Sequence, residues 1–287
     1  MITDNLTNKV YLSNLLPEKC PILNAHITEV LKKRGIPFFY LSGTKDIWCR
    51  DYMPIQIDER FYVFYKYTPD YLQDKIGLQL QTNPEDVFQI EENQLQSFLG
   101  RSIAIDLIVD GGNVVKCGDK IVMTDKVFEE NKAKAFEEVQ RQLEETFRSE
   151  VVFLPWDMKG EDYGHSDGII HYLGNNRVLL TNYADFDEDY AKEYLQILER
   201  HFEVLTLKYN VKRKHKRSWA YINFLQVGNL ILVPQLGISE DEQALEQISD
   251  AIPHCEVIGI PALEAVRRGG ALNCISWNIK DYNHEKQ

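Results

Sequence analysis

The chain has 287 residues, of which 44% are hydrophobic, so it can bury a large core and fold without the support of disulfide bonds or metal ions. Its 32 basic residues face 44 acidic ones, a formal charge of −12 that repels nucleic acid and anionic lipid and attracts small cations. The five cysteines are odd in number and lack a C-x-x-C pair, which argues against a disulfide framework and a zinc knuckle and favours a reducing compartment.

The start of the sequence lacks the basic residues and apolar run of a secretory signal, and no window approaches the roughly 18 apolar residues of a membrane span. We therefore expect a cytoplasmic protein that engages neither a membrane nor nucleic acid. The run 212-KRKHKR-217 departs from the acidic balance. Its usual meaning is a solvated loop, and a nucleic-acid patch is the lesser alternative because no aromatic residues interleave with it.

Along the chain, three segments share one plan, in which a strand follows a turn and an earlier apolar strand and is itself followed by a helix. The later strands are 121-IVMT-124, 178-VLLT-181 and 231-ILVP-234. Their turns are rich in Gly, Asn and Asp, as hairpins prefer. Acidic residues lie near the helix starts, where a helix dipole favours them: Glu129, Asp187 and Glu240. A spacing of about 55 residues indicates repeated supersecondary units that pack on their neighbours.

Two further segments, 37–67 and 256–279, carry part of the same plan, and five such units would close a ring. No Gly/Ser/Pro-rich linker interrupts them, so we interpret residues 1–287 as one domain. Each unit would contribute a strand to the centre of an α/β ring. The loops of these strands would then converge on a polar pocket.

The segments before or beside these strands carry residues suited to chemistry. They are 48-WCRDYMP-54, 110-DGGNV-114, 164-GHSDG-168, 218-SWAYINF-224 and 269-GGALNC-274. Glycines bracket four of the five, which suits backbone that lies close to a ligand. His165 and Asp167 are two residues apart, so in a strand they would project from the same face.

These motifs, in this order, resemble the guanidine-modifying enzymes of the pentein superfamily, most closely the branch of agmatine deiminases and bacterial peptidylarginine deiminases. The resemblance covers nearly the whole chain. It rests on W-x-R-D-x-x-P, an acidic-Gly-Gly motif, G-H-x-D, Y-x-N-F followed by V-P-Q-x-G, and Gly-Gly-x-x-x-Cys. It implies a pentein-type α/β propeller, with five ββαβ-like units in a pseudo-fivefold ring.

The resemblance also implies roles for individual residues. Cys274 would be the nucleophile and His165 the acid/base, while Asp51 and Asp167 would hold the guanidinium. Asp110, which stands where agmatine deiminases usually carry Glu, would also bind substrate. Such residues suit the chemistry, because a guanidinium is a planar cation whose N–H groups carboxylates can grip through bidentate hydrogen bonds.

The implied reaction is hydrolysis of a guanidino group through a covalent thiouronium intermediate, without metal or cofactor. Agmatine, converted to N-carbamoylputrescine and ammonia in putrescine biosynthesis, is the leading substrate. Asn273 stands where agmatine deiminases usually carry His, and the chain is shorter than theirs, so arginine or peptidyl-arginine stays open as substrate. Arg267, Arg268 or the basic run would then bind a carboxylate.

Other classes of function stay open as well. An amidinotransferase would share the covalent intermediate, and a pentein-type binding ring would lack catalysis. Taken alone, Cys274 could be a small buried hydrophobe and His165 a core histidine. A metal site that joins His165 to His171 is disfavoured, since six residues of strand span about 20 Å. Homo-oligomers are compatible with the sequence.

Overall fold

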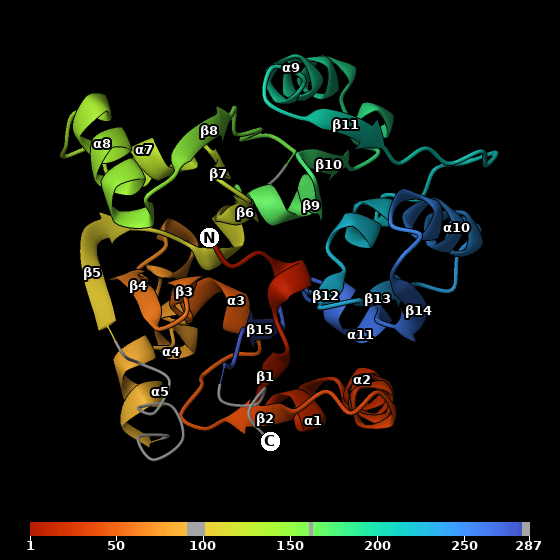
Figure 1. Ribbon diagram of the computed structural model, residues 1–287, viewed down its shortest axis with the longest axis horizontal. Coiled ribbons are helices and arrows are strands. Elements are labelled where there is room, and N and C mark those ends of the chain that lie inside the picture. Colours follow the sequence, from red (N-terminus) through yellow and green to blue (C-terminus); the bar gives the residue numbers. More distant parts are fainter. Residues whose placement is uncertain (91–100, 161–162, 283–287) are drawn as a thin grey trace.

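The computed structural model describes residues 1–90, 101–160 and 163–282, and within them the strands form five three-stranded sheets around one axis (Figure 1). In each sheet the first two strands are antiparallel and the last two are parallel. The sheets are β15 (Ser276–Ile279), β1 (Lys9–Ser13) and β2 (Phe38–Leu41); β3 (Ile55–Asp58), β4 (Phe61–Lys66) and β5 (Arg101–Ile108); β6 (Val115–Cys117), β7 (Lys120–Thr124) and β8 (Glu150–Leu154); β9 (Ile170–Gly174), β10 (Arg177–Leu180) and β11 (Glu203–Thr206); β12 (Leu225–Val227), β13 (Leu230–Gln235) and β14 (Glu256–Pro261).

Helices on the outside of the ring connect the second strand of each sheet to the third (Figure 1). In the order of the sheets they are α1 (Leu16–Lys19) with α2 (Pro21–Lys33), α4 (Gly77–Leu80) with α5 (Pro84–Ile90), α7 (Lys126–Glu130) with α8 (Phe136–Phe147), α9 (Glu188–Leu198), and α10 (Asp241–Ala251). Two short helices, α3 (Cys49–Tyr52) and α11 (Leu263–Val266), precede β3 and β15. Among the described residues, no helix combines the length and the apolar character needed to cross a membrane.

The three repeated segments of the sequence are confirmed as the middle strands β7, β10 and β13. Each follows a hairpin whose turn contains a glycine at positive φ, a conformation that side chains with a Cβ rarely adopt: Gly118, Gly174 and Gly228. The predicted acidic helix starts are also confirmed. Asp187, for example, caps α9 by accepting hydrogen bonds from the backbone N–H groups of Asp189 (2.9 Å) and Tyr190 (3.0 Å).

The two remaining units were placed wrongly by the sequence. Residues 37–67 and 256–279 are not units, because each spans strands of two different sheets. Strand β2 pairs with β1, and β14 completes the sheet of β13. The missing unit is assembled from the first and the last strands of the chain. Strand β15 pairs antiparallel with β1 from Leu12↔Ser276 to Lys9↔Ile279. A pairing between strands so far apart in sequence leaves no local signal in either.

Amphipathic packing holds the outer helices against the sheets. Helix α8 buries Val139, Leu143 and Phe147, which recur every four residues and therefore lie on one face. Burial of each such side chain contributes about 1.5–3 kcal/mol relative to exposure. The middle strands are buried along nearly their whole length, as β1 and β13 show. In β1, Leu12 belongs to one hydrophobic cluster with residues of α2, and Tyr11 belongs to a second cluster with residues of β4.

Polar side chains fill the axis itself, one from the first strand of every sheet. This axial layer consists of Gln56, Lys116, His171, Gln226 and Asn278. Its members are bonded to one another and to the chain around them: Gln226 Oε1 lies 3.3 Å from His171 Nε2, and Asn278 donates to the Gln226 carbonyl at 2.7 Å. Lys116 forms an ion pair with Asp4 at 3.0 Å. The centre of the ring is therefore a hydrogen-bonded polar core.

Candidate active site

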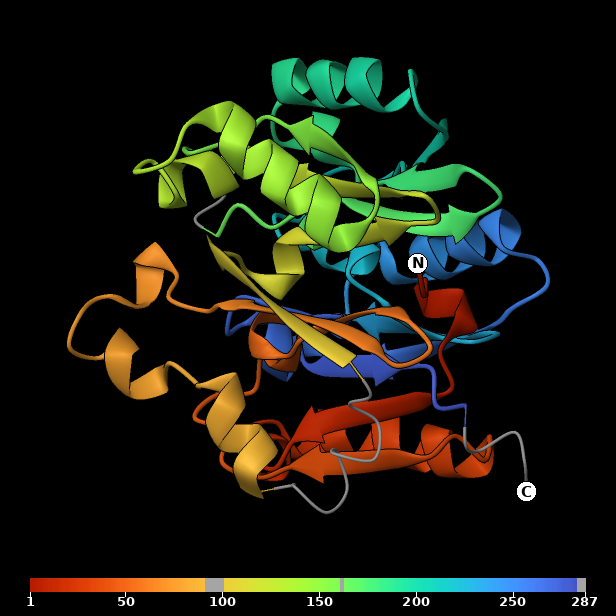
Figure 2. The same ribbon diagram turned by 60° about the vertical axis from the view of Figure 1, so that its left-hand side comes forward.

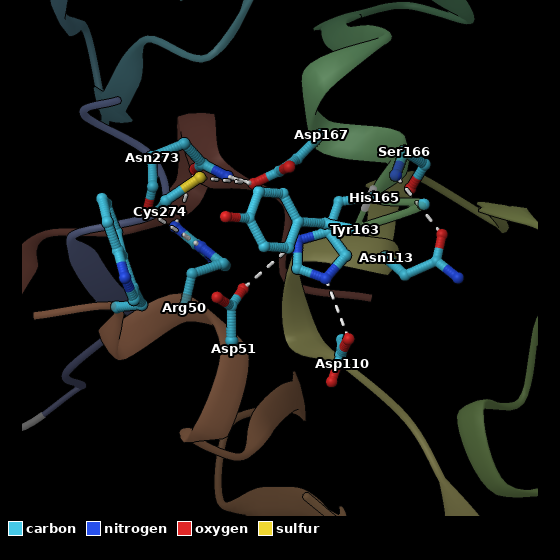
Figure 3. Close-up of polar contacts among 12 residues, drawn as sticks. Arg50, Asp51, Asp110, Asn113, Tyr163, His165, Ser166, Asp167, Asn273 and Cys274 are labelled. Carbon is cyan, nitrogen blue, oxygen red and sulfur yellow. Dashed lines mark hydrogen bonds and ion pairs between the residues drawn. The ribbon is translucent and has the colours of Figure 1, made fainter. Parts of the chain in front are cut away.

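Each of the five sequence motifs lies just before the first strand of a sheet. Figure 3 shows labelled residues of four of these motifs gathered in one place. Four of them form a single helical turn. The turns are α3, and the 3-10 turns Gly111–Asn113, Ser166–Gly168 and Ser218–Ile222. The prediction that His165 and Asp167 share a strand is wrong, because His165 is extended and Asp167 lies in the turn that follows. The turn still places both side chains in the same site.

Cys274 lies among oxygen acceptors and carboxylates. Its Sγ is 3.2 Å from Asn223 Oδ1 and 3.7 Å from Asp167 Oδ2, and the residue is 8% exposed. Burial raises the pKa of the Cys274 thiol well above its usual value, and the charges of Asp167 and Asp51 raise it further. The sulfur is thus a neutral thiol at neutral pH, which a nearby positive charge would convert to the thiolate.

His165 faces two carboxylates. Its Nε2 lies 2.9 Å from Asp110 Oδ2, and its Nδ1 lies 3.7 Å from Asp51 Oδ1 (Figure 3). Burial alone would lower the pKa of His165, but the charge of Asp51, the hydrogen bond to Asp110 and the charges of Asp110 and Asp167 outweigh it and raise the pKa to about 10. His165 is therefore an imidazolium at neutral pH, with a proton to donate.

The carboxylates keep hydrogen-bonding capacity in reserve. Within the described residues, Asp51 Oδ1 and Asp110 Oδ1 are buried without a hydrogen-bond partner. Burial, followed by the charges of Asp110 and Asp167, raises the pKa of Asp51 although His165 opposes the shift. Buried acceptors without donors cost free energy unless a ligand supplies the donors. Asp167 is engaged differently, since its Oδ2 accepts a hydrogen bond from Asn273 Nδ2 at 2.7 Å.

A pocket of about 470 Å³ gives access to these groups. Asp51, His165 and Cys274 line it, whereas Asp110 and Asp167 lie behind its surface. The remaining walls are mostly aromatic and aliphatic: Trp48, Tyr67, Tyr71, Tyr163, Leu72 and Leu80. Asp46 and Arg268 add one acidic and one basic side chain. The pocket therefore offers an apolar passage that ends at a thiol between carboxylates.

Of the three basic groups proposed for a substrate carboxylate, Arg268 alone is among the pocket residues. Arg267 and residues 212–217 are not, and within the latter Lys214 pairs with Asp185 at 3.1 Å. Only Arg268 is therefore placed to meet the distal part of a substrate.

Two glycines of the motifs are required by close packing. A Cβ on Gly112 would lie 2.5 Å from His165 Nδ1 and 2.6 Å from Asp51 Oδ1. A Cβ on Gly270 would lie 2.4 Å from the Trp48 ring. Real Cβ atoms do not approach other heavy atoms so closely, so both positions need glycine for the site to assemble.

Asn223 is a site residue that the sequence reasoning missed. Its Oδ1 accepts a hydrogen bond from the Cys274 backbone N–H at 3.3 Å and faces the thiol, while its Nδ2 donates to the Asp167 carbonyl at 3.2 Å. It lies within the Y-x-N-F motif, which was visible in the sequence. The side chain does not titrate, so a search for acids, bases and nucleophiles passes over it.

Arg50 was missed for a related reason. It is buried and donates to Asn273 Oδ1 (2.9 Å) and Asn278 Oδ1 (2.6 Å), which ties the residue before Cys274 to the axial layer. In sequence it reads as the surface partner of the neighbouring Asp51. Its guanidinium instead points into the protein, and it holds the segment that carries Cys274 in place.

The remaining candidates have structural roles. His171 packs its ring on Phe224, with centroids 3.8 Å apart, and the described part of the chain holds no cluster of three or more His, Cys, Asp or Glu suited to a metal ion. All five cysteines are unbridged. Cys49 lies 3.3 Å from the Tyr52 hydroxyl, and burial raises its pKa to about 12, so it is a packing residue.

Known proteins with the same architecture include the agmatine deiminase of C. jejuni, which matches with a TM-score of 0.75 at 19% identity over 96% of this chain and 94% of that chain. The agmatine deiminase of Enterococcus faecalis matches with a TM-score of 0.72 at 17% identity over 97% and 95% of the two chains. In sequence, a Listeria monocytogenes protein named "Putative agmatine deiminase 1" is 22% identical over 213 residues, which are 61% of this chain and 58% of that protein. The curated relatives are thus matched over less than two thirds of their own length.

The solved structures show the fold, which is the pentein-type α/β propeller of five ββαβ-like units that the motifs predicted. The family model of the Porphyromonas-type peptidyl-arginine deiminases matches residues 17–279. This chain belongs to that family.

Proposed function

We propose that this protein is a cysteine-dependent deiminase that hydrolyses the guanidino group of agmatine to N-carbamoylputrescine and ammonia. One observation carries the proposal. A buried thiol and an imidazolium share a pocket with Asp51, and Asp110 lies behind the surface of that pocket. The Oδ1 atoms of both carboxylates lack hydrogen-bond donors within the described residues. Such a site is short of positive charge and of N–H groups, and a guanidinium supplies both.

Binding of the substrate would activate the nucleophile. Asp51 and Asp167 would accept hydrogen bonds from the edges of the guanidinium, which would hold its central carbon before Cys274. The positive charge of the guanidinium would offset the effect of the two carboxylates on the thiol, so that the thiol proton leaves to solvent. In the free protein the thiol would stay protonated, and it would react only when a cation lies beside it.

In the first half of the reaction, the Cys274 thiolate adds to the guanidinium carbon and forms a C–S bond. His165 donates its proton to the leaving nitrogen, the C–N bond breaks and ammonia departs, which leaves a positively charged thiouronium on Cys274. In the second half, the neutral His165 takes a proton from water as the water adds to the same carbon. The C–S bond then breaks, and the ureido product leaves after loss of one proton.

Agmatine is favoured over arginine by the acidic balance of the chain and by the agmatine deiminases among its relatives. A cysteine-to-serine variant of the C. jejuni agmatine deiminase has been solved with substrate bound. Asp46 offers a carboxylate in the pocket to a distal ammonium, although burial raises its pKa to about 7. Arg268 supports the second candidate, a substrate with a distal carboxylate such as arginine.

The deciding assay is ammonia release from agmatine, arginine and blocked peptidyl-arginine. We expect agmatine to be the best substrate, Asp46→Asn to weaken its kcat/KM, and Arg268→Ala to leave it within about twofold. If arginine is the best substrate, and Arg268→Ala weakens its kcat/KM while Asp46→Asn does not, the second candidate is supported. Ammonia release from none of the three would favour a binding ring. Transfer product with ornithine or glycine, and no ureido compound, would favour an amidinotransferase.

A further inference from the structure

A buried lysine outside the set of reacting groups lies behind the wall of the pocket. Lys126, the first residue of α7, is 1% exposed. Its Nζ donates a hydrogen bond to the Tyr163 carbonyl at 2.8 Å and lies 2.9 Å from Asp70 Oδ1 and 3.7 Å from Glu130 Oε1. The reaction proposed above uses none of these contacts.

The partners of Lys126 come from segments far apart in sequence. Asp70 belongs to the crossover between β4 and β5, which projects from the ring in orange in Figure 2, and Tyr163 belongs to the loop between β8 and β9. An ammonium has three N–H donors, so a single buried lysine can join a carbonyl and two carboxylates. The lysine thus connects two segments that border the pocket from different sheets.

Two aromatic contacts carry this connection to the pocket surface. The Lys126 Nζ lies 4.8 Å from the centroid of the Tyr71 ring, within cation–π range. The rings of Tyr71 and Tyr163 meet edge to face at 5.0 Å, and their centroids lie 6.2 and 5.9 Å from that of His165. Both tyrosines line the pocket beside Cys274. Figure 3 shows the Tyr163 ring against His165 and toward the thiol.

The stem of the same lysine packs against the residue that precedes His165. Gly164 has a φ of +66°, and a Cβ there would lie 2.6 Å from Lys126 Cδ. The loop can therefore approach the lysine only as glycine. Head and stem of Lys126 thus fix Tyr163 and Gly164, the two residues directly before His165.

We propose that Lys126 is a positioning residue that holds Tyr71 and Tyr163 together as one wall of the pocket, against which the alkyl part of the substrate lies. The inference rests on the proposed function, because it assigns the wall to binding of a guanidino substrate. Lys126 touches neither the substrate nor the reacting atoms. Its effect passes through the two tyrosines.

The test compares Lys126→Met with a control, Lys134→Met. Both lysines lie in the crossover between β7 and β8, but Lys134 is partly exposed and pairs with Asp106 and Glu138. Because the wall contacts the substrate body and not the reacting carbon, Lys126→Met should raise the KM for agmatine about tenfold and lower kcat by less than about threefold. Lys134→Met should change neither. A KM within about twofold of the wild-type value in Lys126→Met would overturn the proposal.

Two further variants guard against simple loss of folding. Lys126→Met combined with Glu130→Gln avoids a buried carboxylate without its cation, and Asp70→Asn removes only the contact to the crossover, from a side chain that is 58% exposed. The double variant should reproduce the rise in KM with cooperative unfolding retained. Asp70→Asn should show a smaller rise in the same direction. A folded double variant with wild-type KM would overturn the proposal.

A readout without turnover separates this inference from the proposed function. If the wild type releases no ammonia from any guanidine, the proposed function fails. Hydrogen exchange then still measures whether Lys126 holds the two segments together. Amides of residues 68–72 and 163–165 should exchange faster in Lys126→Met than in the wild type, with the rest of the ring unchanged. Equal exchange in both proteins would show that Lys126 joins nothing.

Discussion

His165 and His171 are six residues apart in the sequence and similarly buried, at 7% and 6% exposure, yet their pKa values are shifted in opposite directions. Burial lowers the pKa of both. For His165 the carboxylates Asp51 and Asp110 outweigh burial and raise the pKa to about 10. For His171 burial is the largest effect, and with the charges of Arg50 and Lys116 it outweighs the charge of Asp4 and the hydrogen bond to Gln226 and lowers the pKa to about 4.

The comparison distinguishes two layers along the axis. In the axial layer, Gln226 is bonded to His171 and Asn278, and the positive charge of Lys116 is met by the carboxylate of Asp4. In the neighbouring layer, which holds the candidate active site, carboxylates outnumber cations. Within the described residues, Asp51 and Asp110 each have a buried oxygen atom without a hydrogen-bond donor. Chemistry is expected where carboxylates outnumber cations, and stability where a buried charge is met by a charge of opposite sign.

The largest effect should come from removal of the nucleophile. Cys274→Ser keeps a similar volume but replaces the thiol with a far weaker nucleophile, so ammonia release should fall by at least about 10³-fold. Thermal unfolding should stay close to that of the wild type. Loss of cooperative unfolding in this variant would instead show that Cys274 supports the fold, as the axial layer does, and would contradict the comparison between the two layers.

The next largest effect should come from the proposed clamp. Asp51→Asn and Asp167→Asn each place N–H donors where the cation needs acceptors, so kcat/KM should fall on the order of 10²-fold through misplacement of the substrate. Alkylation of Cys274 separates the explanations. The variants should react more slowly with 2-chloroacetamidine, which carries an amidinium, and be less affected with iodoacetamide. An equal loss toward both reagents would mean that the carboxylates act on the thiol or the fold.

A smaller effect should follow at Asp110. Asp110→Asn removes a charge and alters a hydrogen bond that raise the pKa of His165, so this pKa should fall below about 10. In the proposed reaction, His165 donates its proton to the leaving nitrogen. The alkaline limb of the pH profile of kcat/KM should therefore move to lower pH, with a loss of about tenfold at the optimum. An unmoved limb would show that another group sets it.

His171 should affect stability and leave activity nearly unchanged. His171→Gln disturbs a buried hydrogen bond and should cost about 1–3 kcal/mol in the free energy of unfolding, with ammonia release within about twofold. Because its folded pKa of about 4 lies below the ordinary value of 6.5, this residue makes the wild type lose stability as pH falls between these values. Urea unfolding should show a smaller difference in the free energy of unfolding between pH 7 and pH 5 for the variant than for the wild type. A loss of activity without a loss of stability would place His171 in the site.

The smallest effect is expected from chelation. In the proposed reaction, the carboxylates and the charge of the substrate take the place of a Lewis acid, so prolonged incubation with EDTA should leave ammonia release unchanged. Activity that EDTA destroys and zinc restores would make the carboxylate-rich layer a metal site and require a different mechanism.

The sequence predicted the parts of the fold that are local. Hairpin turns, the middle strands β7, β10 and β13, and the acidic helix start near Asp187 follow from neighbouring residues and were identified correctly. The pairing of β15 with β1 is non-local, so the unit that it completes was misplaced. We continue to propose one domain for residues 1–287 on the basis of the uninterrupted sequence.

For the site, the order of the motifs predicted which segments meet, and the structure brings Asp51, Asp110, His165, Asp167 and Cys274 together. Their roles remain predictions. Burial decided what sequence could not reveal. It turns Arg50 inward, and it makes the non-titrating Asn223 a neighbour of the thiol.

The closure of the ring by β15 and β1 also concerns the order of synthesis. Strand β1 leaves the ribosome before every other strand of the ring, and β15 leaves after them. Cys274 directly precedes β15, so the carboxylates and His165 are synthesised long before the thiol that completes the site. A nascent chain that lacks residues 274–279 therefore has an open ring and lacks the thiol of the site.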